Sequence, residues 1–170
     1  MHRLAVNVNV HHGQRLGLCT SKTNTEENLK DATVQPLLQQ ELMDVVDLDP
    51  YGSASPFLDA AFRCINDGGL LLVTCTDSAI LCGNYPTTCH AKYNSLPYKA
   101  AHCHEMAVRI VLASLERVAN KHKKYMVPLL SLHIDFYVRC IVRVYTQPAE
   151  VKGSAMKLAH LLQCTHCPAF

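Results

Sequence analysis

The sequence has no apolar run of transmembrane length, and its start, Met1-His2-Arg3-Leu4, has no signal-peptide core. Nine cysteines are present, but the number is odd and most lie in apolar segments, as Cys75 and Cys140 do. Such cysteines behave as small buried hydrophobic residues and are typical of a reducing compartment rather than of a disulfide framework. We expect a soluble intracellular protein with no membrane contact.

Neither sign of charge predominates, since the net charge of the 170 residues is only +2. The charges are unevenly placed. Residues 1–50 carry 4 Lys and Arg against 7 Asp and Glu, whereas residues 101–170 carry 9 against 4. The basic half suits a nucleic-acid surface, and it suits an ordinary solvated surface equally well. The hydrophobic content of 49% is enough for one domain with a core.

The middle of the chain predicts a strand, a helix and a second strand. Residues 44–48 form a short apolar strand, and residues 56–66 have helical spacing and end at Gly68-Gly69. Residues 70–76 are almost continuously apolar, as expected for a parallel strand buried on both faces. Residues 1–28 support no assignment.

The second half predicts a helix over 104–120 and two strands over 126–133 and 136–145. The link between the two strands is so short that they must pair antiparallel. Pro128 lacks an N–H group, which places its strand at a sheet edge. A parallel α/β sheet closed by an antiparallel strand resembles class I methyltransferases and differs from dinucleotide dehydrogenases.

The motif Asp49-Pro50-Tyr51-Gly52 follows the first predicted strand directly. Pro and Gly are placed as a type I turn requires, Ser55 offers an N-cap oxygen, and Pro56 suits a first helical turn. In an open α/β sheet, ligands bind beyond the carboxyl ends of the strands. The motif is therefore either a plain strand-to-helix turn or a site.

The chemistry that fits this motif is methylation of an aromatic amino group. Such an amine is a poor nucleophile because its lone pair is delocalised into the ring. A carboxylate and a backbone carbonyl can accept hydrogen bonds from the NH2 group, while an aromatic face holds the unstacked base. Asp49, the Pro50 carbonyl and Tyr51 supply these three parts, and proline fixes the direction of its carbonyl.

The chain resembles the eukaryotic tRNA (guanine(26)-N2)-dimethyltransferase family over residues 28–170. The resemblance is carried by four blocks in order: Asp44 to Ala60, Gly68 to Leu81, His102 to Ser114, and Val127 to Val144. It implies S-adenosylmethionine as methyl donor and the N2 amino group of guanine 26 in tRNA as acceptor, methylated once or twice. It also implies a class I S-adenosylmethionine-dependent methyltransferase fold, located in the nucleus or the mitochondrion.

The resemblance assigns roles residue by residue. Asp49, Pro50 and Tyr51 match the catalytic positions, with Tyr51 packing near the base, and Asp49 also borders the cofactor. Asp31-Ala32 resembles the pair that meets the adenine ring of the cofactor. Thr76-Asp77 ends the second strand at the same edge of the sheet, so it either lines the base pocket or, in the case of Asp77, caps the next turn.

The chain also departs from the family pattern. Neither a glycine-containing cofactor loop nor the acidic residue that holds the ribose precedes Asp31. We therefore expect an uncertain segment at 1–27, a partial, N-terminally truncated catalytic domain at 28–148, and the start of a truncated C-terminal domain at 149–170. A missing first strand predicts an unpaired sheet edge along residues 44–48 and weak binding of the cofactor.

Two further motifs concern metals. Cys164 and Cys167 form a C-x2-C pair, half of a tetrahedral zinc site, and the resemblance implies that zinc binds there. His104-Glu105 begins like a zinc-protease motif, but Val108 stands where the second histidine is needed, which excludes that function. His102 and His104 are expected at a helix start, as caps or as cleft residues.

Two alternative functions remain open. One is an amino-methyltransferase acting on another base, which uses a similar acidic or amide residue, proline and aromatic. The other is an inactive fragment that serves as an RNA-binding or interaction module. Cofactor binding separates the second from both enzymes.

Overall fold

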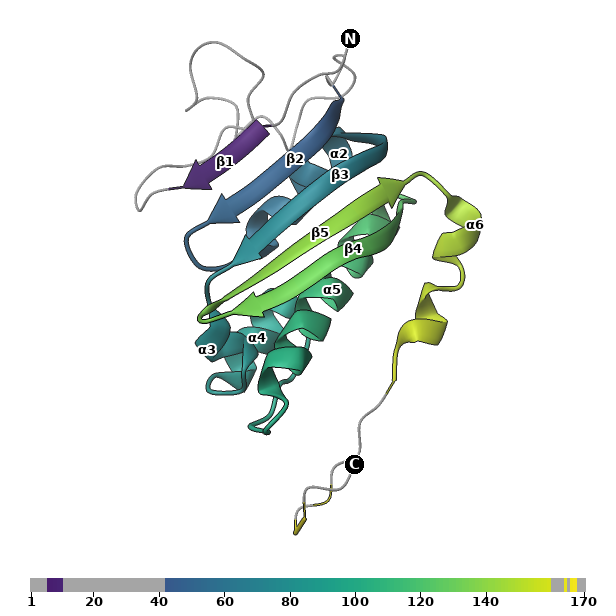
Figure 1. Cartoon of the computed structure of the whole chain (residues 1–170). Coiled ribbons are helices and arrows are strands. Elements are labelled where there is room, and N and C mark those ends of the chain that lie inside the picture. Colours follow the sequence, from purple (N-terminus) through teal and green to yellow (C-terminus); the bar gives the residue numbers. More distant parts are fainter. Residues whose placement is uncertain (1–5, 11–41, 160–163, 165, 168–170) are drawn as a thin grey trace.

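The computed structural model describes residues 6–10, 42–159, 164 and 166–167. Their strands form one mixed sheet in the order β1-β2-β3-β5-β4 (Figure 1). The strands are β1 (Val6–Val10), β2 (Met43–Pro50), β3 (Ile65–Cys75), β4 (Tyr125–Ile134) and β5 (Tyr137–Tyr145). The helices are η1 (Ser55–Phe57), α2 (Leu58–Cys64), α3 (Ser78–Leu81), α4 (Pro86–Tyr93), α5 (Cys103–Lys121), α6 (Pro148–Val151) and η2 (Ser154–Lys157).

The predicted strand–helix–strand unit is confirmed, because β2 and β3 pair in parallel with α2 between them. The prediction that Gly68-Gly69 ends the helix is wrong. Helix α2 ends at Cys64, Ile65 is already extended, and both glycines lie inside β3. Gly68 has a φ of +74°, and a Cβ on Gly69 would lie 2.8 Å from the Ile65 side chain. These glycines therefore permit an irregular start of β3, where the pairing register with β2 shifts.

The second half of the chain matches the prediction. The β4–β5 pair is an antiparallel hairpin, β5 pairs antiparallel with β3, and β4 with Pro128 is the last strand of the sheet. The register of the hairpin shifts just after Pro128. Asp135 in its turn has a φ of +48°. Because β5 is antiparallel to both β3 and β4, strands β3 and β4 run in the same direction. Both strands therefore end at the same edge of the sheet.

The predicted unpaired edge along residues 44–48 is wrong in this structure. Strand β1 pairs in parallel with β2, from Val6 beside Val46 to Val10 beside Pro50. The signal in the sequence is the alternation of three valines with Asn7 and Asn9, since β-branched residues favour strands. That alternation was too short to support an assignment by itself.

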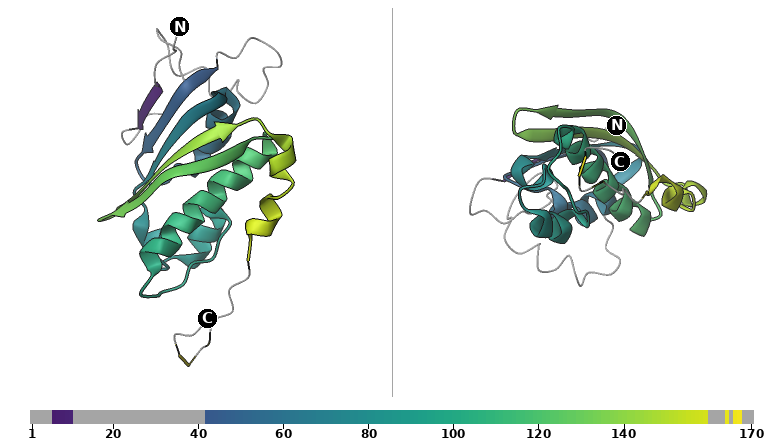
Figure 2. Two further views of the ribbon diagram at one scale, coloured as in Figure 1. Left: turned by 45° about the vertical axis from the view of Figure 1, so that its right-hand side comes forward. Right: turned by 90° about the horizontal axis from the view of Figure 1, so that it is seen from below.

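Helices α2, α3, α4 and α5 all lie on one face of the sheet (Figures 1 and 2). The core lies between this helical layer and the sheet. It includes Val46 and Leu48 of β2, Leu71 and Val73 of β3, and Leu115 of α5. Among the helices in the described parts of the chain, none is long and apolar enough to cross a bilayer.

Candidate functional site

The residues singled out in the sequence lie along one edge of the sheet, which we call the carboxyl edge and define as residues 49–53, 75–78 and 133–136. Asp49 and Pro50 are the last residues of β2. Thr76 and Asp77 follow the end of β3. Asp49 is half-buried, whereas the side chain of Tyr51 is 80% exposed. The Tyr51 side chain therefore projects from the edge of the sheet into solvent.

Two hydrogen bonds fasten the motif to the neighbouring strand. The Gly52 N–H donates to Thr76 Oγ1 at 2.8 Å, and the Thr76 N–H donates to the Gly52 carbonyl at 2.8 Å. Gly52 has a φ of +88°, a conformation that other residues adopt only with strain. Thr76 thus fixes the turn that carries Asp49 and Tyr51, a role that the sequence alone did not reveal.

The helix that follows the motif begins differently from the prediction. Pro56 occupies the first turn, as expected, but Ser55 does not cap the helix through its side chain. The Ser55 hydroxyl donates instead to the Lys92 carbonyl at 2.5 Å. The Ser53 hydroxyl accepts the Ser55 N–H at 3.2 Å. The motif is therefore attached to α4 as well as to β3.

Asp77 is a structural residue in this arrangement. The Asp77 side chain is only 8% exposed. Its carboxylate accepts a hydrogen bond from the Tyr93 hydroxyl at 2.7 Å and forms an ion pair with Lys92 at 3.3 Å. Asp77 stands at the N-cap position of α3, and its carbonyl accepts the Ile80 N–H at 2.9 Å, although its side chain makes no cap hydrogen bond. Burial, with Cys75 and Asp77 nearby, raises the pKa of Tyr93 far above its usual range, so Tyr93 remains a donor. Asp77 therefore holds α4 against the end of β3.

Asp47, two residues before Asp49, forms an ion pair with Arg139, and the contacts of Arg139 join strands β2, β3 and β5. Arg139 of β5 contacts Asp47 of β2 through both guanidinium ends, at 2.9 and 3.0 Å, and also donates to Thr74 of β3. Both charged side chains are largely buried: that of Asp47 is 19% exposed and that of Arg139 is 23% exposed. Asp47 and Asp49 lie on the same face of β2. Arg139 pairs with the first of these two carboxylates, Asp47.

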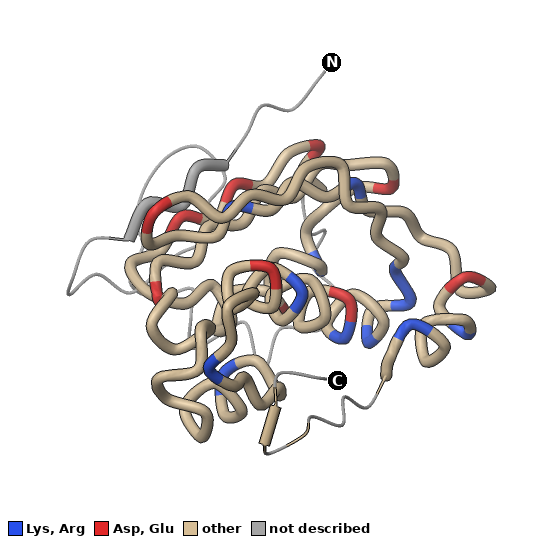
Figure 3. The backbone as a smooth tube through the Cα atoms, turned by 60° about the horizontal axis from the view of Figure 1, so that its bottom comes forward, with Lys and Arg blue, Asp and Glu red and all other residues tan. Residues whose placement is uncertain are grey.

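The basic half of the chain does not form a cluster at this edge. The cluster Lys121 to Lys124 lies at the other end of α5, where Lys124 donates to the carbonyl of Ile65, the first residue of β3. Arg109 pairs with Glu105, and Lys157 pairs with Glu116. Figure 3 shows basic residues mainly in the helical layer and after β5. Several of these basic side chains thus bind groups of the same chain. This favours the alternative that the basic half is an ordinary solvated surface.

The histidines at the start of α5 are only partly as predicted. His102 stands at the N-cap position without a side-chain cap, and its Nε2 lies 2.7 Å from the Tyr98 hydroxyl. His104 Nδ1 lies 3.1 Å from His133 Nε2 and 3.9 Å from the Cys82 thiol. Val108 is buried in the core. The grouping of His104 with His133 and Cys82 was not foreseen.

The remaining site predictions concern the two ends of the chain. Asp31 and Ala32 lie outside the described residues. Cys164 and Cys167 are both exposed, and the His166 N–H lies 3.4 Å from Cys164 Sγ. Donation from the His166 and Cys167 groups lowers the pKa of Cys164. A thiol that is more easily ionised suits a zinc ligand.

Comparison with known proteins identifies the relatives of this chain. A model of the family "N2,N2-dimethylguanosine tRNA methyltransferase" matches residues 8–169, a longer stretch than the resemblance in the sequence suggested. The tRNA (guanine(26)-N(2))-dimethyltransferase 2 of Arabidopsis thaliana is 50% identical over 148 residues, which cover 87% of this chain and 25% of that protein. The tRNA (guanine(26)-N(2))-dimethyltransferase of Mus musculus is 57% identical over 130 residues, 76% of this chain and 20% of that protein.

A solved structure shares the fold. It is Trm1 from Pyrococcus horikoshii with S-adenosyl-L-methionine, with a TM-score of 0.64 and 35% identity, covering 65% of this chain and 30% of that one. The mixed sheet and this neighbour confirm the predicted class I methyltransferase fold. The chain spans about a quarter of the length of the curated relatives that it matches best. By its sequence and its fold, the chain belongs to the N2,N2-dimethylguanosine tRNA methyltransferase family.

Proposed function

We propose that this chain carries the acceptor site of an enzyme that transfers methyl groups from S-adenosylmethionine to the N2 amino group of guanine 26 in tRNA. The observation that carries the proposal is the fixed turn at the carboxyl edge. Asp49 and Pro50 end a central strand, Tyr51 is exposed beside them, and Thr76 locks the turn through two hydrogen bonds. The names of the relatives supply the substrate.

The side chains divide the work as follows. Asp49 and the Pro50 carbonyl accept hydrogen bonds from the N2 hydrogens, which directs the amine lone pair toward the methyl group. The Tyr51 ring stacks on the unstacked base. Bound S-adenosylmethionine supplies an electrophilic methyl carbon. As N2 bonds to that carbon, the electrons of the breaking C–S bond remain on sulfur, and a proton leaves N2 along its hydrogen bond to Asp49.

The Asp47–Arg139 pair supports this division. Two carboxylates on one face of β2 would repel each other, and the guanidinium 2.9 Å from Asp47 removes that repulsion. For the donor we propose Asp31, Ala32 and Asp49 as contacts, on the strength of the sequence resemblance. Thr76 acts by positioning the turn, and its exposed flank borders the base.

Cys164 and Cys167 are proposed as half of a structural zinc site. Both thiols are exposed, and the lowered pKa of Cys164 favours the thiolate that zinc requires. Two thiolates complete only half of a tetrahedral shell. For location, we propose the mitochondrion or the nucleus. A 42% identical relative from Saccharomyces cerevisiae is named a mitochondrial enzyme.

One experiment separates the enzyme from an inactive RNA-binding module. Calorimetric titration with S-adenosylmethionine is combined with transfer of labelled methyl groups to a tRNA transcript carrying guanine at position 26. We expect binding and transfer, and transfer should be lost when guanine 26 is replaced by adenine. Binding of tRNA without binding of S-adenosylmethionine would support the module instead. Transfer to the adenine-26 transcript would support an enzyme for another base.

A further inference from the structure

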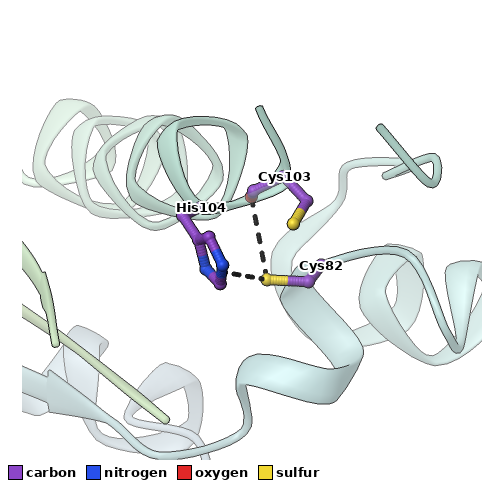
Figure 4. A group of neighbouring side chains, drawn as sticks. All are labelled: Cys82, Cys103 and His104. Atoms are coloured by element: carbon purple, nitrogen blue, oxygen red, sulfur yellow. Dashed lines mark hydrogen bonds between the residues drawn. The ribbon is translucent and has the colours of Figure 1, made fainter. Parts of the chain in front are cut away.

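Three metal-binding side chains meet beside the carboxyl edge, from segments that are far apart in the sequence. Cys82 follows the last residue of α3, and Cys103 and His104 begin α5. One ligand atom from each of the three lies within 4.8 Å of the other two. Figure 4 shows the Cys82 thiol and the His104 ring facing each other across the gap between the two helices. None of these residues takes part in the proposed methyl transfer.

The distance between Cys82 Sγ and His104 Nδ1 is close to the distance between a sulfur and a nitrogen ligand in a tetrahedral zinc site. Zinc binds sulfur at about 2.3 Å and imidazole nitrogen at about 2.0–2.1 Å, which places a sulfur and a nitrogen ligand roughly 3.5 Å apart. The observed distance from Cys82 Sγ to His104 Nδ1 is 3.9 Å. A shift of a few tenths of an ångström, within reach of side-chain rotation, closes the difference.

The group whose ligand atoms all lie within 4.8 Å of one another holds Cys82, Cys103 and His104, and a second histidine, His133, lies beside His104. His133, near the end of β4, has its Nε2 3.1 Å from His104 Nδ1, with ring centroids 4.2 Å apart. Two nitrogen ligands of one zinc ion lie roughly 3.4 Å apart by the same geometry. Ser78 Oγ lies 3.2 Å from the same Nε2, so zinc would take the place of this hydrogen bond when it binds.

The site is open to an incoming ion. Cys82 and Cys103 are half-buried and His104 is exposed, so a cation reaches the group from solvent. Soft thiolates together with imidazoles select zinc over hard cations such as Mg²⁺.

We propose that Cys82, Cys103, His104 and His133 form a structural zinc site that fastens α3 and the start of α5 to the end of β4. Helix α3 begins at Ser78, directly after Thr76 and Asp77. The metal therefore stiffens the segment whose Thr76 is hydrogen-bonded to Gly52 in the turn that carries Asp49 and Tyr51. This site is distinct from the Cys164–Cys167 pair in position and in ligands. It goes beyond the proposed methyl transfer and does not depend on it.

The test uses the full chain under a non-thiol reductant, in a Cys164→Ser/Cys167→Ser background that removes the other thiol pair. Zn²⁺ affinity is measured by competition with a chromophoric chelator, and Co²⁺ absorption reports thiolate ligation. We expect about one tightly bound Zn²⁺ per chain and a tetrahedral thiolate–Co²⁺ spectrum. Cys82→Ser and His104→Gln should each weaken binding at least about tenfold, and His133→Ala should weaken it and alter the Co²⁺ spectrum.

Cys64→Ser is the matched control, because Cys64 is another half-buried free thiol, located at the end of α2. It should leave Zn²⁺ affinity unchanged. Circular dichroism of each variant checks folding, and if Cys82→Ser does not fold, the exposed His104→Gln decides the outcome. The proposal is overturned if the background chain binds no Zn²⁺, or if Cys82→Ser and His104→Gln bind Zn²⁺ as tightly as the background chain does.

Discussion

Gly52 and Thr76 hold each other through two hydrogen bonds of 2.8 Å, and this reciprocal pair joins the ends of β2 and β3. Gly52 stands directly after Tyr51 and Thr76 directly before Asp77. The geometry of the acceptor turn therefore depends on a residue outside the turn.

Thr76→Val removes the hydroxyl acceptor while keeping the shape of the side chain. The Gly52 N–H then lacks its partner, and we expect a stability loss of about 1 kcal/mol with a larger relative loss of methyl transfer. Urea denaturation and transfer kinetics measure the two effects. Thr76→Ser keeps the oxygen and should restore transfer. Equal, small effects of both variants would show that the hydrogen bond does not position the turn.

Asp49→Ala should abolish methyl transfer with little loss of tRNA affinity, because affinity for nucleic acid depends mainly on phosphate contacts. Tyr51→Ala should weaken transfer by the loss of base stacking, on the order of 1–3 kcal/mol, whereas Tyr51→Phe should have a mild effect. Transfer assays and filter binding of tRNA are made on the same preparations. Near-normal turnover in Asp49→Ala would exclude it as the acceptor carboxylate.

Arg139→Met leaves the largely buried Asp47 without its cation. We expect a stability loss of about 2 kcal/mol, because one uncompensated charge stays inside the sheet. The double variant Asp47→Leu/Arg139→Met removes both charges and should recover most of that loss. Urea denaturation of the three proteins measures this. If the double variant is as unstable as the single one, the loss comes from packing and not from charge.

Cys164 should be alkylated at lower pH than an ordinary thiol. Its pKa is lowered chiefly by the backbone N–H of His166, so the thiolate persists as pH falls further than in the unfolded chain. His166→Pro removes that N–H and should move the midpoint of the rate–pH profile upward, while His166→Ala should not. Alkylation followed by mass spectrometry between about pH 7 and 9 gives the profile. An identical midpoint in both variants would contradict this origin.

The local parts of the fold could be predicted from the sequence. The long apolar face of α5, the hairpin after it and the edge position of Pro128 depend on residues close in the chain, and all three are as expected. Gly68-Gly69 misled the prediction because glycines serve helix ends and irregular strand starts alike. The sequence pattern does not distinguish the two.

The contacts that fix the site join distant residues. Arg139 and Asp47 are 92 positions apart, and Cys82 and His104 are 22 apart. No short pattern contains either pair, so the charge pair and the proposed zinc ligands emerge only when β5 lies beside β3 and α5 packs beside α3. The motif at Asp49 was visible because its three chemical parts are consecutive.

The most direct test of the central claim replaces guanine 26 of the tRNA by inosine, which lacks only the 2-amino group. Labelled methyl transfer from S-adenosylmethionine is compared on the two transcripts, with Asp49→Ala as the matched protein control. We expect label on the guanine transcript and none on the inosine transcript, and no label on either transcript with Asp49→Ala. Equal labelling of both transcripts, or no labelling of either by the unaltered chain, would contradict it.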